Sequence, residues 1–296
     1  MDRRHFIVAA AGSAMAGGRL WAGAGDAELD IWQRDTDAVK ADVFRRYLAD
    51  GDTRSLVSLE QVEAAFEKVV REAETVEVGD MPAVWSVYNM GYLVKTKESL
   101  FSIDLVHRRA PELADKLDFA LITHNHADHC DMRLYRALNG AKKTVISNFL
   151  DNYGAYSWRT GTGVGGFTRA EKTFRLKDVE IRTSLVDHNG YLIDFTTAFE
   201  IRVGGWKFYH TGDCGRSCKL KTHWGEPDLW TFFPGCGVDV ADAVRRIRPK
   251  RLVFGHLWEL AHDTGRLTTP LIRAARDRAT AAGYEPTVAL WGERIS

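Results

Sequence analysis

The apolar residues of the first part of the chain recur at helical spacing. Between Ala27 and Asp50 they stand mostly three or four positions apart and Gly51 ends the pattern, which predicts one helix. The segment Ser58-Leu59-Glu60-Gln61 has the order of a capping box, so a second helix is expected to run from Ser58 to about Glu72. Neither helix gathers metal-binding or nucleophilic groups. A packing or lid role is therefore favoured over substrate binding.

From Val84 onward, apolar runs of strand length alternate with helical patterns. Strands are predicted over residues 84–94, 100–104, 119–122, 144–146, 179–184, 191–195, 198–203, 206–210, 251–254 and 287–290. Helices are predicted over residues 111–117, 132–138, 238–247 and 270–282. Strands followed by a helix, twice over, are typical of an α/β fold, a four-layer αββα sandwich with two sheets face to face between helices. We expect one domain over residues 81–296, after a helical extension over residues 25–80.

The first residues have the order of an export signal. Arg3-Arg4 precede an apolar, small-residue stretch from Val8 to Gly18, and both Ala14-Met15-Ala16 and Ala22-Gly23-Ala24 offer small-residue cleavage sites. The pattern predicts a twin-arginine signal peptide over residues 1–24 and a periplasmic or secreted protein. The alternative is an apolar helix that the mature protein keeps. No other stretch approaches the roughly 18 apolar residues of a membrane span.

Composition and net charge limit the classes of partner that the protein is expected to bind. The chain is 45% hydrophobic and 27% charged, as in an ordinary globular protein, and its 40 basic and 40 acidic side chains cancel. Without a net positive field or a long basic run, we expect no nucleic-acid partner. A small-molecule substrate is expected instead, and the oligomeric state stays open.

Four cysteines are present, at positions 130, 214, 218 and 236. An even number in an exported protein permits disulfides. Cys130 and Cys214, however, each directly follow a candidate metal ligand, and no pair has the spacing of a zinc ribbon. Small buried side chains behind a metal site are therefore the favoured interpretation.

The segment from Thr123 to His129 holds the densest group of candidate ligands. It directly follows the apolar run 119–122, and it contains His124, His126, Asp128 and His129. Because side chains alternate along a strand, His124 and His126 leave its end toward the same side. Imidazoles and carboxylates are the ligands that zinc and related metals prefer. Three of the ten histidines fall within six residues, so a metal site is favoured over a polar loop with incidental histidines.

Three later positions stand next to predicted strands in the same way. They are His188, Asp213 and His256, and each alone is more typical of a capping or core polar group. Together with the first motif they supply five histidines and two aspartates, enough for two metals with positions left open for water. His210 precedes Asp213 by three residues, and either a core position or contact with substrate is open to it. The glycine-rich residues 159–169 lack the Gly-Lys-Ser/Thr of a phosphate-binding loop, so a surface loop edging the site is expected.

Over about residues 82–296 this ordered set of motifs resembles the metallo-β-lactamase superfamily of metal-dependent hydrolases. The resemblance implies that one metal is bound by His124, His126 and His188, and a second by Asp128, His129 and His256, with Asp213 bridging the two. It also implies that Asp104, at a strand end, supports the ligand loop. Residues 241–256 look most like the branch that contains the ascorbate-6-phosphate lactonase and the N-acyl-phosphatidylethanolamine phospholipase D type. The helical extension has no counterpart in the shared core.

The resemblance implies hydrolysis by a hydroxide that bridges two divalent metal ions, Zn²⁺ or alternatively Mn²⁺ or Fe²⁺. The bond is ester-like: a lactone, phosphodiester, carboxylic ester or amide. Asp128 and Asp213 are the candidates to orient the water or accept its proton, and His210 is the candidate to contact substrate. An iron-dependent oxidoreductase is a second possibility, although its flavodiiron type places Glu where this chain has His126. A non-catalytic metal-binding scaffold is a third.

Overall fold

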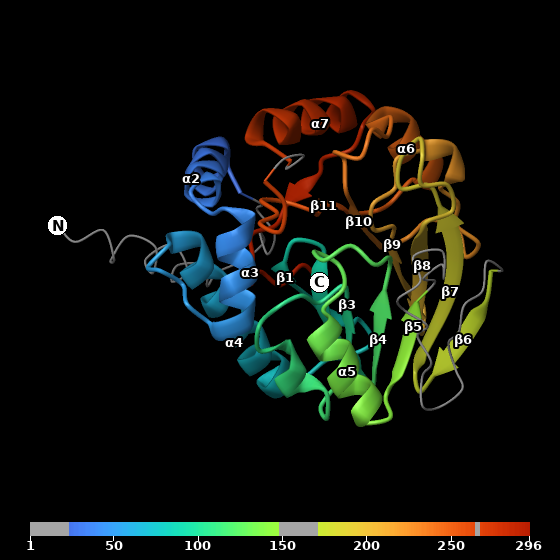
Figure 1. Ribbon diagram of the computed structural model, residues 1–296. Helices are drawn as coiled ribbons and strands as arrows, with labels where there is room; N and C mark the ends of the chain where they lie inside the picture. Colours follow the sequence, from blue (N-terminus) through green and yellow to red (C-terminus); the bar gives the residue numbers. More distant parts are fainter. Residues whose placement is uncertain (1–23, 148–170, 264–266) are drawn as a thin grey trace.

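The computed structural model describes residues 24–147, 171–263 and 267–296, and the expected signal peptide and glycine-rich loop lie almost wholly outside them. Two sheets stand face to face in the middle of the molecule (Figure 1). The first has the order β1-β2-β3-β4-β5 and the second the order β12-β11-β10-β9-β8-β7-β6. Their strands are β1 Ala83–Tyr88, β2 Gly91–Lys95, β3 Leu100–Ile103, β4 Phe119–Ile122, β5 Thr144–Ser147, β6 Thr173–Leu176, β7 Val179–Val186, β8 Thr196–Val203, β9 Trp206–His210, β10 Leu229–Phe232, β11 Leu252–Phe254 and β12 Thr287–Val288.

Helices cover the outer face of each sheet, so the expected four-layer sandwich is confirmed. The helices α4 and α5 pack on the first sheet, and α6 and α7 pack on the second, with α2 and α3 joining the second group (Figure 1). Their bounds are α2 Asp26–Asp37, α3 Ala41–Asp50, α4 Val57–Thr75, α5 Met132–Gly140, α6 Val240–Ile247 and α7 Thr269–Ala281, with short 3₁₀ turns η2 Ala110–Leu113 and η4 Ser217–Lys219. In the described part of the chain, no helix combines the length and apolar character that a membrane crossing requires.

The alternation of side chains along β4 shows how an unbroken apolar run serves two layers. Phe119 and Leu121 point into the core between the sheets, whereas Ala120 and Ile122 pack under the outer helices. All four side chains are buried. A strand buried on both faces is expected to be apolar throughout, and this run ends where the candidate ligands begin.

Several expected elements differ from those observed. The single helix over 27–50 is two helices, because α2 ends at Asp37 and α3 starts afresh at Ala41, whose N–H donates to Asp263 Oδ1 at 2.9 Å. The capping box at Ser58 is wrong: α4 begins at Val57, and the buried Ser58 hydroxyl has no hydrogen-bond partner within the described part of the chain. A helix already anchored by a buried apolar face does not depend on a side-chain cap.

Two expected strands are also wrong. Residues 84–94 form a hairpin rather than one strand, since Asn89 takes a left-handed φ of +54° and turns the chain. Residues 191–195 form no strand, because Asn189 Oδ1 accepts hydrogen bonds from the N–H groups of Tyr191 and Leu192 and closes a turn. The pattern also missed β6 and β10.

Candidate metal centre

The loop after β4 is held in place from behind by one buried carboxylate. Asp104 follows β3 and accepts hydrogen bonds from Thr123 N at 2.7 Å and from Thr123 Oγ1 at 2.6 Å. Its Oδ2 also lies 2.8 Å from His129 Nδ1. Because β3 and β4 are parallel neighbours, the ends of both strands meet at this point. Asp104 therefore fixes the start of the loop and the orientation of the His129 ring.

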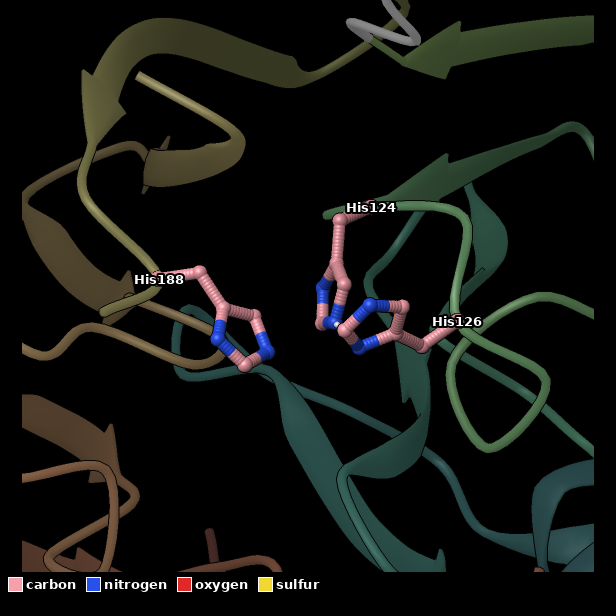
Figure 2. Close-up of side chains that lie close together, drawn as sticks. All are labelled: His124, His126 and His188. Carbon is pink, nitrogen blue, oxygen red and sulfur yellow. Dashed lines mark hydrogen bonds between the residues drawn. The ribbon is translucent and has the colours of Figure 1, made fainter. Parts of the chain in front are cut away.

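The first group of candidate ligands consists of His124, His126 and His188, whose ring nitrogens lie within 4.8 Å of one another. Figure 2 shows the three imidazoles converging, two from the loop after β4 and one from the segment after β7. His124 Nε2 lies 3.1 Å from His126 Nδ1. The buried ring of Phe195 stands beside all three imidazoles, with centroid distances from 5.3 to 5.9 Å, and forms an apolar wall.

The second group consists of Asp128, His129 and His256, all buried and again within 4.8 Å of one another. His256 directly follows Gly255, at the end of β11 in the opposite sheet. Its Nε2 lies 2.9 Å from Asp128 Oδ2, and His129 Nε2 lies 3.3 Å from the same oxygen. The ring of Phe233 stacks on His256 with centroids 3.9 Å apart and restricts its rotation.

Asp213 lies between the two groups. Its Oδ1 is 3.3 Å from His129 Nε2, and its Oδ2 is 3.3 Å from His188 Nε2 and 3.4 Å from His256 Nε2. It follows β9, which carries it to the ends of β4 and β11. One buried carboxylate thus faces ring nitrogens of both groups, as a bridging ligand requires.

The bonding state of these side chains fits cations. Among the described residues, the buried Asp128 Oδ1 has no hydrogen-bond partner, and Asp213 Oδ1, His129 Nε2 and His188 Nε2 make only ion-pair contacts of 3.3 Å without hydrogen-bond geometry. Leaving a buried carboxylate oxygen unpaired costs at least about 1–3 kcal/mol. Four such atoms that converge are best explained as ligand atoms, and imidazole with carboxylate is the donor set that zinc and related metals take.

The pKa values of the side chains in the centre also favour a bound cation. Burial favours the neutral form of Asp213, but the imidazoles of His256 and His129 outweigh it and hold the pKa of Asp213 well below its ordinary value. Conversely, burial works against a charge on His256, yet Asp213 and Asp128 raise its pKa to about 10. Without a metal, protons on His129 and His256, whose pKa values are raised, compensate the carboxylates, whereas burial lowers the pKa values of His124 and His126 and keeps these rings neutral. A bound cation would take the place of these protons, so metal binding would release them.

His210 does not reach the centre. It is fully buried, with Nδ1 2.7 Å from Thr231 Oγ1 and Nε2 3.3 Å from Asp104 Oδ2. Both ring nitrogens are therefore engaged inside the protein, and no exposed atom is left to touch a substrate. This geometry favours a positioning role through Asp104 over the expected contact with substrate.

The structure adds residues that the sequence pattern did not single out. Asn89 donates to Asp128, and Glu259 and His262 form a further possible ligand group with Asp128. All four cysteines are free thiols, and Cys130 and Cys214 are buried, as expected. Cys236 donates to the backbone oxygen of His188 at 2.6 Å, which places its sulfur beside the first group. No spacing rule connects these residues to the histidines, so only their placement in space reveals them.

Fold and site together define the class of metal-dependent hydrolases with the metallo-β-lactamase fold. The chain belongs to the beta-lactamase superfamily domain family, whose model matches residues 86–252, more than half of the chain. The match ends before His256 and leaves out the helical extension.

Individual relatives are distant. A UPF0173 metal-dependent hydrolase of Haloquadratum walsbyi is 23% identical over 176 residues, which are 53% of this chain and 72% of the relative. Among solved structures, the metallo-beta-lactamase fold protein YhfI of Bacillus subtilis aligns with a TM-score of 0.51 and 16% identity, over 72% of this chain and 98% of that one. CmlA, a diiron beta-hydroxylase of Streptomyces venezuelae, aligns with a TM-score of 0.52 and 12% identity, over 73% of this chain and 54% of that one. At such identities the structures are similar in fold alone.

Proposed function

We propose that this protein is a hydrolase that uses two divalent metal ions to cleave an ester-like bond in a small molecule. The position of Asp213 carries the proposal, because one carboxylate faces His188 of the first group and His129 and His256 of the second within 3.4 Å. A site for one metal would not need a carboxylate shared in this way. The relative from Haloquadratum walsbyi, named a metal-dependent hydrolase, supports the reaction class.

The candidate ligands form two sets, one for each metal. His124, His126 and His188 would hold one metal, and Asp128, His129 and His256 the other, with Asp213 between them. When bound, such a pair lowers the pKa of a water toward about 7 and polarises the oxygen of the bond under attack. Asp128 Oδ1, which has no hydrogen-bond partner among the described residues, would orient that water and take up its proton. Phe195 and Phe233 pack apolar rings against the imidazoles on the two sides, and such apolar surroundings would strengthen these charge interactions.

Metal analysis combined with a substrate panel tests the proposal. The purified protein is expected to hold two equivalents of metal and to hydrolyse a member of a panel of lactones, phosphodiesters, carboxylic esters and amides. Chelation should abolish the activity, and added Zn²⁺ or Mn²⁺ should restore it. Asp213→Asn is expected to remove activity, whereas Asp228→Asn, at the opposite end of the same sheet, should keep it. Full activity after thorough chelation would refute the proposal.

Iron-dependent oxidation is the second candidate, since CmlA shows that a diiron enzyme uses this fold. His126 speaks for hydrolysis, because an imidazole rather than a carboxylate stands at that position of the first group. Tightly bound iron together with turnover that consumes O₂ would favour oxidation. A non-catalytic scaffold would bind metal and turn over none of the panel.

Export is part of the proposal. It rests on Arg3-Arg4 and the apolar stretch that follows, in residues that the structure does not describe. Replacing both arginines by lysine is expected to keep the protein in the cytoplasm of a host with the twin-arginine pathway. Periplasmic protein in unchanged amount would contradict this assignment.

A further inference from the structure

The turn between β1 and β2 reaches the metal centre from the edge of the first sheet. At this turn Asn89 is 3% exposed and has a φ of +54°. Few residues other than glycine adopt this left-handed conformation, and asparagine is one of them. The tight turn buries a polar side chain next to Asp128.

Asn89 contacts two of the candidate ligands. Its Nδ2 donates to Asp128 Oδ2 at 3.1 Å and to the backbone oxygen of Asp128 at 3.2 Å. Its own backbone oxygen accepts from His256 N at 3.4 Å, and it forms an isolated antiparallel bridge with Leu257. The side chain therefore holds one ligand and the main chain holds the other.

These two ligands come from opposite sheets. Asp128 follows β4 in the first sheet, and His256 follows β11 in the second. The bond from Asn89 holds Asp128 Oδ2, the oxygen that also faces His256 and His129, while the buried Oδ1 has no hydrogen-bond partner among the described residues. One residue thus sets the orientation of Asp128 and its register against His256.

The neighbouring residue fills the remaining space. Met90 packs so closely on Gly255 that a Cβ there would overlap the Met90 sulfur and come within 2.8 Å of Tyr92 Oη. Glycine at 255 therefore lets the tip of the hairpin lie directly against the residue before His256. The close packing indicates that the contact between the β1–β2 hairpin and the end of β11, just before His256, is part of the fold.

From these contacts we propose that Asn89 is a positioning residue for the second metal position, orienting Asp128 through its amide and His256 through its backbone. This inference rests on the proposed function only in taking the two groups as metal sites. Partners that orient a metal ligand typically contribute 10- to 100-fold in metal affinity. The affinity of the second position should fall by about that factor when the amide is lost.

Two variants separate the side chain from the backbone. Asn89→Gly keeps the left-handed turn, and with it the bond to His256, but removes the amide. Asn89→Asp keeps size and turn while replacing the donor by an acceptor. Lys142→Gly is the matched control, because Lys142 is exposed, also left-handed with a φ of +57°, and lies at the end of α5.

The measurement is a titration of metal-free protein with Co²⁺ and Zn²⁺, followed by calorimetry and by the visible spectrum of Co²⁺. The step that belongs to the second position is the one that Asp128→Ala removes. Both Asn89 variants should weaken that step about 10- to 100-fold while the other step and the unfolding temperature stay near those of the Lys142→Gly control.

Each outcome of the titration bears on the positioning role of Asn89 or on the proposed function. An unchanged second step in both Asn89 variants overturns the positioning role while leaving the metal centre intact. Equal weakening of both steps, in proportion to lost stability, overturns it as well, since the role would then be structural. If the unaltered protein binds no metal, the proposed function fails and this inference fails with it. If it binds two metals but hydrolyses nothing, only the proposed reaction fails.

Discussion

Trp32 and Trp258 stack on each other with ring centroids 5.0 Å apart and an interplanar angle of 28°. Trp32 belongs to α2 in the helical extension, whereas Trp258 lies two residues beyond His256. Trp291 meets Trp32 edge-on at 4.8 Å and completes the cluster. The segment before β1, which the family model does not cover, therefore packs against a residue two positions after a candidate ligand.

Truncating Trp32 should disturb the second metal position. Trp32→Ala removes a ring that is 8% exposed, which is expected to lower the free energy of unfolding by about 3 kcal/mol. It should also weaken metal binding at His256, because the loop with Trp258 loses its support. Chemical unfolding and metal titration measure the two effects. Ile31→Ala, one residue earlier and 45% exposed, should change neither, and unaltered metal affinity in Trp32→Ala would contradict the expectation.

Gly255 offers a test of the packing between the β1–β2 hairpin and the end of β11. Gly255→Ala places a methyl group against Met90, which must move or push His256 aside. We expect weaker metal binding and a loss of stability of about 1–3 kcal/mol. Met90→Ala alone leaves a cavity, whereas in the double variant the clash with Met90 is gone and only Tyr92 Oη, at 2.8 Å, must shift for the new methyl. The double variant should therefore be more stable than the sum of the single changes predicts, and strict additivity in a double-mutant cycle would rule out this contact.

The alternation of apolar residues was sufficient to predict the layers and the ligand loop. The run 119–122 fills two layers at once, and a strand of this kind can only deliver His124 and His126 at its end. Asp213 and His256 could be predicted from the sequence because parallel strands end at the same edge of a sheet, so polar residues at their ends meet. The geometry confirms that these side chains lie together, and their role as ligands stays a prediction.

Other features depend on contacts that no local pattern encodes. Asn89 lies within an apolar run, which predicts a strand and not a turn. The turn depends on Gly91 and Gly255, which permit close approach of the backbone. The helix break before Ala41 depends on Asp263, more than two hundred residues away. Ser58 has the order of a cap, but it lies within the first turn of α4 and is fully buried. In each case tertiary packing outweighs local preference.

Asp104 and His210 should act on the metal without touching substrate. Asp104→Asn keeps the shape but weakens the acceptor for His129, and should lower metal affinity about 10- to 100-fold. His210→Gln removes a partner of Asp104 Oδ2 and should have a smaller effect of the same kind. If His210 only positions Asp104, its variant at saturating metal should keep its KM. A raised KM with unchanged metal affinity would restore the expected contact with substrate.

His107, which follows β3, is linked to α3 and α4 through a chain of hydrogen bonds. Its Nδ1 accepts from Arg109 N at 3.1 Å, so the neutral ring carries its proton on Nε2, which lies 2.9 Å from Tyr47 Oη. Tyr47 in turn donates to Glu63 at 2.9 Å. The ring of His107 also stacks on Phe66, with centroids 4.0 Å apart. A proton on Nδ1 would break the bond from Arg109.

Stability should therefore depend on pH through His107. Burial, aided by Arg108, lowers its pKa from 6.5 to about 3, so the unfolded chain binds a proton that the folded chain excludes between these values. The free energy of unfolding should fall as the pH drops below about 6.5, by up to about 1.4 kcal/mol per pH unit. In urea unfolding of metal-free protein, His107→Gln should make this fall shallower by about one proton. Tyr47→Phe should keep the slope while lowering stability, because burial of His107 persists, and an unchanged slope in His107→Gln would assign the pH dependence to other groups.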